Sequence, residues 1–546
     1  MPGAIAVDFV FGKLINDELK LTYHRASRHG VQHLHRIAPA DPTPEDNVTV
    51  RVVTSGDFRI QRLSLYYTVD GSIPLGSRGI SGSAGLVEFE RVRTEWDTLV
   101  WDYLCHWEAI IPAQPDQTTV NYAISAWSAQ GEEIYADYPD AEDRLRHATM
   151  RFFKSLPEDS LYEPEEQGNA PLFTYHVDRQ SAPNWGHDAI IYQIFLDRFH
   201  PGKGWDWLQT ADLNRFCGGT LWGVRDKLDY LADLGINCLW LSPTWSSPSC
   251  HGYDVADYDS VEPRLGGDGA LRAVVEGAHR RGIRVLLDLV CNHISNQHPF
   301  FLDAWSDTGS AYRDWFDFDE RYNHGYRCFF NVETMPEVNL EHPAAREWMI
   351  GNAVRCLRDF DVDGFRLDYA NGAGPNFWAH FRPWVKTAKE DCLLLGEIID
   401  TPDRLRLYQG RLDGCLDFPL NDALRKTFAW KTWPETRFTS FVKDHARYFD
   451  GDFVMPSFLD SHDMDRFSFV ANNDVDPLKR AVAAQMRLPN PPIILYGAEI
   501  GLRQAESTRD KTLDVSRVPM VWDDGQDQDL LAYYRERIQD RKSRRS

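Results

Sequence analysis

The chain has 546 residues, of which 43% are hydrophobic and 26% charged, a composition typical of a soluble globular enzyme. This length predicts two to four domains, or one large barrel with additions. Asp and Glu number 82 against 59 Lys and Arg, so the net charge is −23. Because such a surface repels phosphate backbones and anionic lipid, we expect neither nucleic acid nor membrane as a partner.

Nine cysteines are scattered along the chain without a CxxC pair, which argues against a zinc site. Residues 1–20 lack the basic stretch and apolar run of a signal peptide. No window approaches the length of a membrane-spanning helix. We therefore expect a cytoplasmic protein.

The first part of the chain alternates short β-type runs with turn signals. Such runs occupy residues 48–53, 63–69 and 119–127. They predict an N-terminal immunoglobulin-like β-sandwich over residues 1–158. Residues 159–185, rich in Pro, Glu, Gln and Asn, are expected to form a linker or junction.

From Ala189 onward, short apolar runs alternate with amphipathic stretches, a pattern typical of a parallel sheet buried on both faces. Eight runs can be counted, the number in a (β/α)8 TIM barrel, at 190–195, 238–241, 285–290, 364–369, 393–398, 415–420, 455–459 and 493–496. The predicted fold class is thus α/β, with the catalytic barrel at 186–292 and 342–546. An inserted loop domain at 293–341 follows the third strand.

Polar clusters close several of these predicted strands. The most prominent carboxylates are Asp368, Glu397 and Asp463, after the fourth, fifth and seventh strands. Taken singly, an Asp at a strand end is more often a helix cap or an arginine partner. Three carboxylates on three strands of one barrel, however, would all reach the same opening, where catalytic groups of such barrels lie.

Glycosidic bond cleavage supplies a chemical reason for this set, because it needs one carboxylate that attacks and one carboxylic acid that donates a proton. Arg366 is expected to hold Asp368 ionised, and neighbouring carboxylates to raise the pKa of Glu397. Asp463 could bind sugar hydroxyls and stabilise developing positive charge. The Asp368 and Glu397 carboxyl groups are expected to lie about 5–5.5 Å apart, the retaining spacing.

The strand ends resemble the conserved segments of glycoside hydrolase family 13, the α-amylase family. The matching segments are 288–293, 364–371, 396–398 and 458–463, with further similar stretches at 218–228, 335–339 and 494–501. The resemblance covers roughly residues 185–545 in the family's order.

This resemblance implies that Asp368 is the nucleophile, Glu397 the acid/base and Asp463 the transition-state stabiliser. The implied substrate-binding residues are Tyr253, Asp254, His293, Arg366, Asn371, His462 and Arg466. No cofactor is required, although Asn292 is similar to the family's calcium-associated Asn and marks an expected calcium position.

Within the family, Met335-Pro-Glu-Val-Asn339 is similar to a segment of the neopullulanase, cyclomaltodextrinase and maltogenic amylase group. That group has Glu where Gly372 stands here. Its N-terminal β domain implies a homodimer formed through that domain. The family's C-terminal β domain is expected to be absent, since only an amphipathic helix at 527–541 and a basic tail follow the eighth strand.

The function expected from these features is hydrolysis of α-1,4-glucosidic bonds in cyclodextrins, maltooligosaccharides or starch-like glucans, with α-1,6 cleavage or transglycosylation as additional activities. An α-glucosidase or glucanotransferase on the same scaffold is the alternative. A non-catalytic carbohydrate-binding protein is a more distant one, disfavoured because all three carboxylates are retained.

Overall fold

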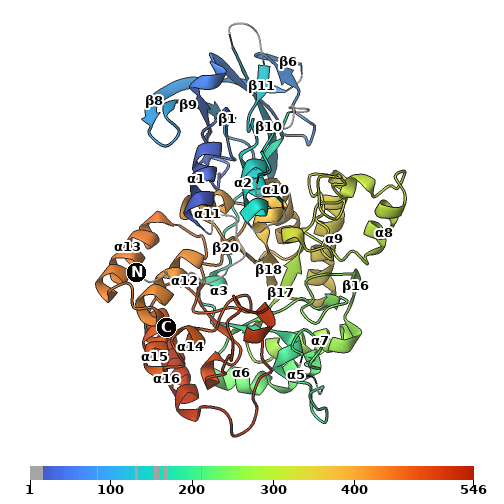
Figure 1. Ribbon diagram of the computed structural model, residues 1–546, viewed down its shortest axis with the longest axis vertical. Coiled ribbons are helices and arrows are strands. Elements are labelled where there is room, and N and C mark those ends of the chain that lie inside the picture. Colours follow the sequence, from blue (N-terminus) through green and yellow to red (C-terminus); the bar gives the residue numbers. More distant parts are fainter. Residues whose placement is uncertain are drawn as a thin grey trace.

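The computed structural model describes residues 16–545, apart from residues 83, 129–132, 153–155, 158, 165–169, 209, 211 and 450. Part of the predicted N-terminal domain and of the predicted junction therefore lies outside the described residues. An N-terminal β domain stands at one end of the molecule, and the larger barrel forms the rest (Figure 1).

The N-terminal domain is a sandwich of two antiparallel sheets. One contains β1 (Val31–Gln32), β2 (Ile37–Ala38), β3 (Val48–Ser55), β8 (Glu90–Asp97) and β9 (Asp102–Ile111). The other contains β4 (Arg62–Thr68), β7 (Gly85–Glu88), β10 (Thr118–Trp127), β11 (Glu133–Tyr135) and β12 (Phe173–Val177). A short hairpin, β5 (Gly76–Ser77) and β6 (Ile80–Ser81), is appended. Alternate side chains of both sheets enclose one apolar core, as the period-2 pattern predicted.

Two features of this region differ from the expectation. Helices α1 (Asp17–Ala26) and α2 (Ala141–Phe152) accompany the strands, and Asn16 caps α1 by accepting from Leu19 N at 2.8 Å. The predicted linker at 159–185 also contains β12, which pairs with β10 and is buried along its whole length. That part of the expected linker is therefore a strand of the sandwich.

Eight parallel strands form the barrel. They are β13 (Ile191–Ile194), β14 (Cys238–Leu241), β17 (Arg284–Val290), β18 (Gly364–Asp368), β19 (Leu393–Gly396), β20 (Gly414–Cys415), β21 (Ser457–Phe458) and β22 (Pro492–Leu495). A parallel bridge between Gly414 and Val454 joins β20 to the segment before β21 and closes the ring. The sixth strand is shorter than expected, because Asp417 caps a helix, α12 (Phe418–Leu424), in the middle of the predicted run.

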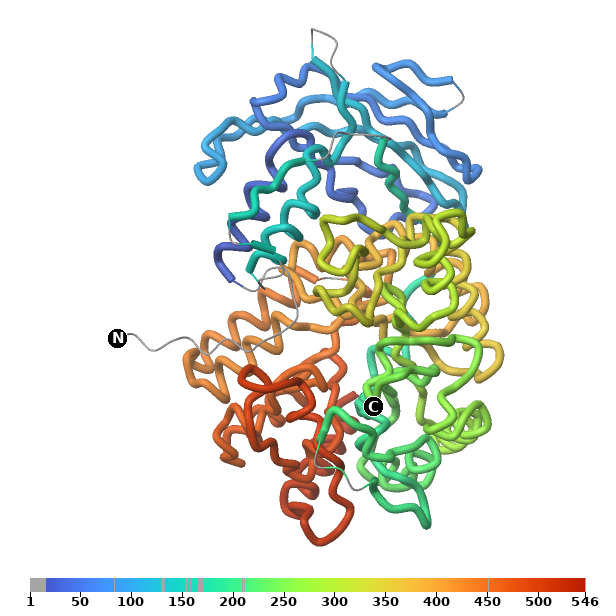
Figure 2. The backbone as a smooth tube through the Cα atoms, turned by 45° about the vertical axis from the view of Figure 1, so that its right-hand side comes forward, coloured from blue at the N-terminus to red at the C-terminus, as the bar shows by residue number. Residues whose placement is uncertain are grey.

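Helices surround the strands (Figure 2). In chain order they are α3 (Asn184–His187), α4 (Leu196–Phe199), α5 (Leu221–Asp226), α6 (Leu228–Leu234), α7 (Gly267–His279), α9 (Pro343–Phe360), α10 (Ala370–Ala388), α11 (Pro402–Leu405), α13 (Glu435–Tyr448), α14 (Phe467–Val470), α15 (Val475–Gln485) and α16 (Gln528–Arg545). A hairpin, β15 (Trp245–Ser246) and β16 (Asp257–Val261), follows β14, and α8 (Pro299–Ser306) lies in the inserted segment after β17. No helix of the described residues is long and apolar enough to cross a membrane.

The N-terminal domain packs on the barrel through buried polar contacts. Arg404 of the barrel bonds Tyr23 of α1 and Glu142 of α2. Asn376 of α10 donates to Leu172 O at 2.7 Å and accepts from Thr174 N at 2.9 Å. Because a buried guanidinium or amide is costly to leave unpaired, these bonds fix the two parts against each other.

Candidate active site

The barrel strands carry apolar residues inward along most of their length and polar ones at their carboxyl ends. On β18, Arg366 and Asp368 are two apart and therefore share a face. The register sets Arg366 opposite Asp288 of β17 and opposite Leu395 of β19, two residues before Glu397. Period and register together thus bring these side chains to one end of the barrel.

The three predicted carboxylates converge on one cavity. Asp368 ends β18, Glu397 follows β19, and Asp463 lies in the turn after β21. All three line a cavity of about 560 Å³. Asp368 and Glu397 are buried, and Asp463 is largely buried. The volume of the cavity lies in the range of small-molecule binding sites, so the cavity can hold part of a sugar chain.

One guanidinium joins the carboxylates of the fourth and fifth strands. Arg366 Nη1 donates to Asp368 Oδ1 at 2.8 Å, and its Nη2 lies 2.6 Å from Glu397 Oε1. The same Nη1 bonds both oxygens of Asp288 at 2.7 and 2.9 Å. Since both carboxylates touch one rigid planar group, Arg366 fixes their relative position.

Burial changes the expected electrostatics of Asp368. Arg366 was expected to hold Asp368 ionised, and its charge does lower the pKa of that carboxyl. The effect of burial is larger, however, and raises the pKa of Asp368 well above its usual range. Burial likewise raises the pKa of Glu397, although Arg366 lowers it.

Asp463 has the opposite electrostatic environment. Burial alone would raise its pKa, but His462 and then Arg517 lower it well below its usual range. His462 Nε2 lies 2.9 Å from Asp463 Oδ2, and Arg517 Nη2 donates to Asp463 Oδ1 at 2.6 Å. Asp463 is therefore ionised at neutral pH, which suits a residue that stabilises positive charge.

Two of the predicted substrate-binding residues line the cavity beside the carboxylates. The Tyr253 hydroxyl lies 2.5 Å from His462 Nε2 and donates to Asp288 at 3.0 Å, and its ring stacks on His462 at 5.4 Å. Burial lowers the pKa of His293 to about 4, so the imidazole is neutral. Within the described part of the chain, His293 Nε2 has no hydrogen-bond partner, which leaves it free to bind a ligand hydroxyl.

The other five predicted substrate-binding residues stand outside the set that lines this cavity. Arg366 and His462 contact its carboxylates, as described above. Asp254 accepts from Ser247 Oγ at 2.6 Å, and Asn371 accepts from Ile399 N at 3.3 Å. Arg466 is fully buried and donates to the backbone oxygens of Ser516 and Tyr496, both at 2.9 Å. These contacts give Arg466 a supporting position rather than one facing the cavity.

The surroundings of Asn292 do not fit a calcium ion. Its side chain is buried, and its amide nitrogen lies 3.4 Å from His293 Nδ1. Its oxygen faces Gly372, where an added Cβ would lie only 2.0 Å away. Among the described residues, no group of three or more His, Cys, Asp or Glu could hold a metal, whereas Ca²⁺ takes six to eight oxygens.

The same contact explains why glycine occupies position 372. Any side chain there would overlap the Asn292 amide, so this packing requires glycine.

Several residues of the site were not predicted from the sequence. Arg517 follows the eighth strand in a stretch without periodicity, and Phe329 comes from the inserted segment; both line the cavity. Asp288 belongs to a predicted strand-end cluster, but its bond to Arg366 depends on the pairing of β17 with β18. No local signal marks Arg517, because only the closed barrel brings it to Asp463.

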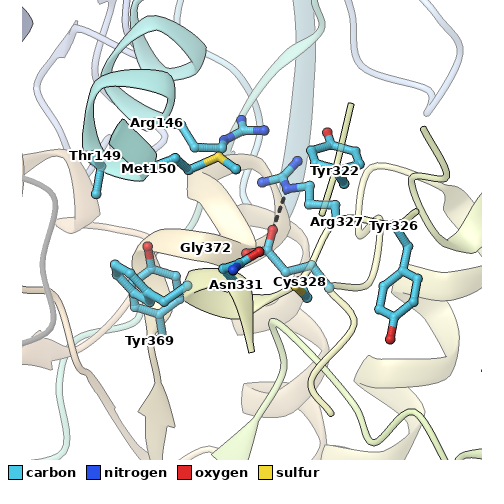
Figure 3. Close-up of a pocket in the computed structure, with 12 residues that line it drawn as sticks. Arg146, Thr149, Met150, Tyr322, Tyr326, Arg327, Cys328, Asn331, Tyr369 and Gly372 are labelled. Atoms are coloured by element: carbon cyan, nitrogen blue, oxygen red, sulfur yellow. Dashed lines mark ion pairs between the residues drawn. The ribbon is translucent and has the colours of Figure 1, made fainter. Parts of the chain in front are cut away.

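A second, smaller cavity of about 80 Å³ lies where the N-terminal domain meets the inserted segment. Figure 3 shows Arg146, Thr149 and Met150 of α2 on one side and Arg327, which pairs with Glu337, on the other. Tyr369 lines both this cavity and the catalytic one, and its backbone N–H donates to Glu397 Oε2 at 3.1 Å. Tyr369 of the barrel is thus a wall residue of both the catalytic cavity and the cavity that α2 of the N-terminal domain lines.

Carboxylates on the fourth, fifth and seventh strands of a parallel barrel, two of them joined by one arginine, define a carboxylate-dependent glycoside hydrolase. Comparison with known proteins agrees, since the alpha amylase catalytic domain family matches residues 193–534. The chain belongs to this α-amylase family of glycoside hydrolases.

Individual relatives cover more of the chain. It is 31% identical over 540 residues to "Alpha-amylase 2" of Dictyoglomus thermophilum, covering 98% of this chain and 86% of the relative. It is 34% identical over 388 residues to "Intracellular maltogenic amylase" of Bacillus subtilis, covering 68% of this chain and 64% of that relative. A solved structure of a cyclomaltodextrinase superposes with a TM-score of 0.63 at 27% identity, covering 94% of this chain and 84% of that one.

Proposed function

We propose that this protein is a retaining hydrolase of α-1,4-glucosidic bonds that acts on cyclodextrins, maltooligosaccharides or starch-like glucans. The observation that carries the proposal is the Arg366 bridge between Asp368 and Glu397, open to a cavity that also contains ionised Asp463. The names of the relatives, maltogenic amylase and cyclomaltodextrinase, support this substrate class.

In the proposed reaction, Asp368 attacks the anomeric carbon while Glu397 gives its proton to the leaving glycosidic oxygen. Water then hydrolyses the glycosyl–Asp368 ester, with Glu397 as general base. Burial raises the pKa of both carboxyl groups, and the proposed reaction has them hold one proton between them. That proton is placed on Glu397, which leaves Asp368, an acceptor of Arg366 Nη1, ionised for the attack. Ionised Asp368 and Asp463 then stabilise the positive charge that develops on the sugar.

The neutral His293 and the Tyr253 ring support binding of the attacked sugar, His293 by hydrogen bonding and Tyr253 by stacking against an apolar face. Asp254, Asn371 and Arg466 are proposed to support the same subsite from behind the cavity wall. A cytoplasmic location agrees with the name of the intracellular relative and with nine cysteines that are all free thiols. A homodimer through the N-terminal domain remains part of the proposal.

Product analysis tests this proposal. Purified protein is incubated with γ-cyclodextrin, starch and pullulan, and separately with maltose and isomaltose, and the products are separated by chromatography. Maltose and short maltooligosaccharides released from the first group with retained α-configuration are expected, and Glu397→Gln should release them about 10²–10⁴-fold more slowly. Cleavage of maltose or isomaltose alone would instead identify an α-glucosidase, and longer products from maltotriose a glucanotransferase.

A further inference from the structure

The loop that follows β19 carries Glu397 and leads directly into α11. Arg404 of α11 lies against the N-terminal helices α1 and α2 (Figure 1). The Arg404 side chain is only 12% exposed, and that of its partner Asp400 is 2% exposed. A buried ion pair thus begins three residues beyond Glu397, outside the set of residues that line the catalytic cavity.

Arg404 contacts side chains from three separate segments. Its Nε pairs with Asp400 Oδ2, and its Nη1 donates to the hydroxyl of Tyr23 on α1. The same Nη1 lies 2.5 Å from Glu142 Oε1 of α2, and the guanidinium carbon lies 4.5 Å from the centre of the Tyr23 ring. Because the guanidinium is planar and its donors have fixed directions, these contacts hold Asp400 in one position relative to both helices.

Asp400 in turn holds the loop that carries Glu397. Its Oδ1 accepts from Thr401 N at 2.7 Å, and its Oδ2 accepts from Asn371 Nδ2 at 3.4 Å. Asn371 Oδ1 accepts from Ile399 N at 3.3 Å, two residues beyond Glu397. Asp400 therefore fixes this loop both directly and through Asn371, which belongs to the segment after β18.

Stability alone does not account for this buried pair. Burial raises the pKa of Asp400, and the charge of Arg404 lowers it by less. Because desolvation offsets much of the attraction between buried charges, a well-packed apolar pair of similar volume is often no less stabilising. An apolar pair, however, does not fix the direction of the loop beyond Glu397, and a displacement of about 1 Å can lower an enzymatic rate about 10²-fold.

We propose that Asp400 and Arg404 are positioning residues for Glu397, and that Glu142 and Tyr23 of the N-terminal helices hold Arg404 in place. This inference rests on the proposed function, in which Glu397 gives its proton to the leaving oxygen. Such a donor works only within hydrogen-bond reach of that oxygen, about 2.6–3.2 Å. The docking of α1 and α2 on the barrel then controls proton transfer, although neither helix lines the catalytic cavity.

Leaving-group dependence separates this role from a structural one. Phenyl α-maltoside and 2,4-dinitrophenyl α-maltoside present the same sugars, but only the phenyl leaving group needs a proton. Arg404→Met should lower kcat/KM about 10- to 100-fold on phenyl α-maltoside and γ-cyclodextrin, and less than about threefold on the dinitrophenyl compound. Glu397→Gln should show the same contrast, and Arg404→Lys should recover part of the loss. The control is Arg406→Met, at an exposed arginine 5.1 Å from the Tyr448 ring, which should change neither maltoside reaction.

Arg404→Met leaves Asp400 and Glu142 without their partner, so Glu142→Gln provides a milder second variant that keeps the pair of Arg404 with Asp400. It should lower kcat/KM on phenyl α-maltoside about threefold or more and leave the dinitrophenyl compound unchanged, and circular dichroism checks that each variant is folded. Equal losses on both maltosides in the folded variants, or no loss on either, would overturn the positioning role. If the parent protein cleaves both maltosides but releases nothing from γ-cyclodextrin, starch or pullulan, the proposed function fails, and the contrast between the maltosides still decides the inference.

Discussion

Arg517 was not predicted from the sequence as a residue of the site. Its replacement tests the site most directly. Its guanidinium donates to Asp463 Oδ1 at 2.6 Å and to His462 O at 2.8 Å, and it is buried. A charge-assisted hydrogen bond of this kind contributes about 1.5–3 kcal/mol. Arg517→Met is therefore expected to lower kcat/KM on γ-cyclodextrin about 10- to 150-fold.

The pH dependence distinguishes a positioning role from a merely structural one. Arg517 lowers the pKa of Asp463, so its removal raises that pKa. The reaction needs ionised Asp463. The acid limb of the kcat/KM profile, where activity falls as the pH decreases, should therefore move to higher pH. Arg517→Lys keeps the charge and should restore the limb while leaving part of the rate loss. If Arg517→Met lowers only the melting temperature and leaves both the rate and the acid limb of folded enzyme unchanged, this reasoning is refuted.

Three further predictions follow from the site. Glu397→Gln should reduce kcat on γ-cyclodextrin by about 10²–10⁴-fold and abolish the alkaline limb of the pH profile, since that limb reports loss of the Glu397 proton; a persisting limb would assign it to another group. Gly372→Ala should destabilise the protein by about 1–3 kcal/mol in urea unfolding, because its Cβ meets the Asn292 amide; Asn292→Ala should recover part of this loss, and purely additive effects would contradict the overlap. The pKa of His293 is about 4 when folded and about 6.5 when unfolded, so the unfolded chain takes up the proton first as pH falls. Protonation of His293 in the unfolded chain is therefore expected to lower the free energy of unfolding by about 2–3 kcal/mol between pH 7 and 4.5. His293→Gln should abolish this part of the loss, and an unchanged pH dependence would show that His293 does not titrate this way.

Much of the architecture could be predicted from local pattern. The eight apolar runs alternating with amphipathic stretches specify a parallel barrel, because only strands buried on both faces are apolar throughout. The predictions of the sixth strand and of the junction at 159–185 were less accurate. Asp417 and Pro419 start a helix inside an apolar run, and β12 becomes a strand only because β10 offers an edge to pair with.

The chemistry of the site depended on tertiary structure to a greater degree. The residue types and strand ends in the sequence were sufficient to select Asp368, Glu397 and Asp463 as the catalytic carboxylates, since side-chain period and strand direction are local properties. The burial of Asp368 is a property of packing, and it raises the pKa of that carboxyl in spite of Arg366, opposite to the expected direction. Sequence determined which groups are present; the folded chain decided which share a charge, which are buried and which face solvent, because these depend on distances between segments far apart along the chain.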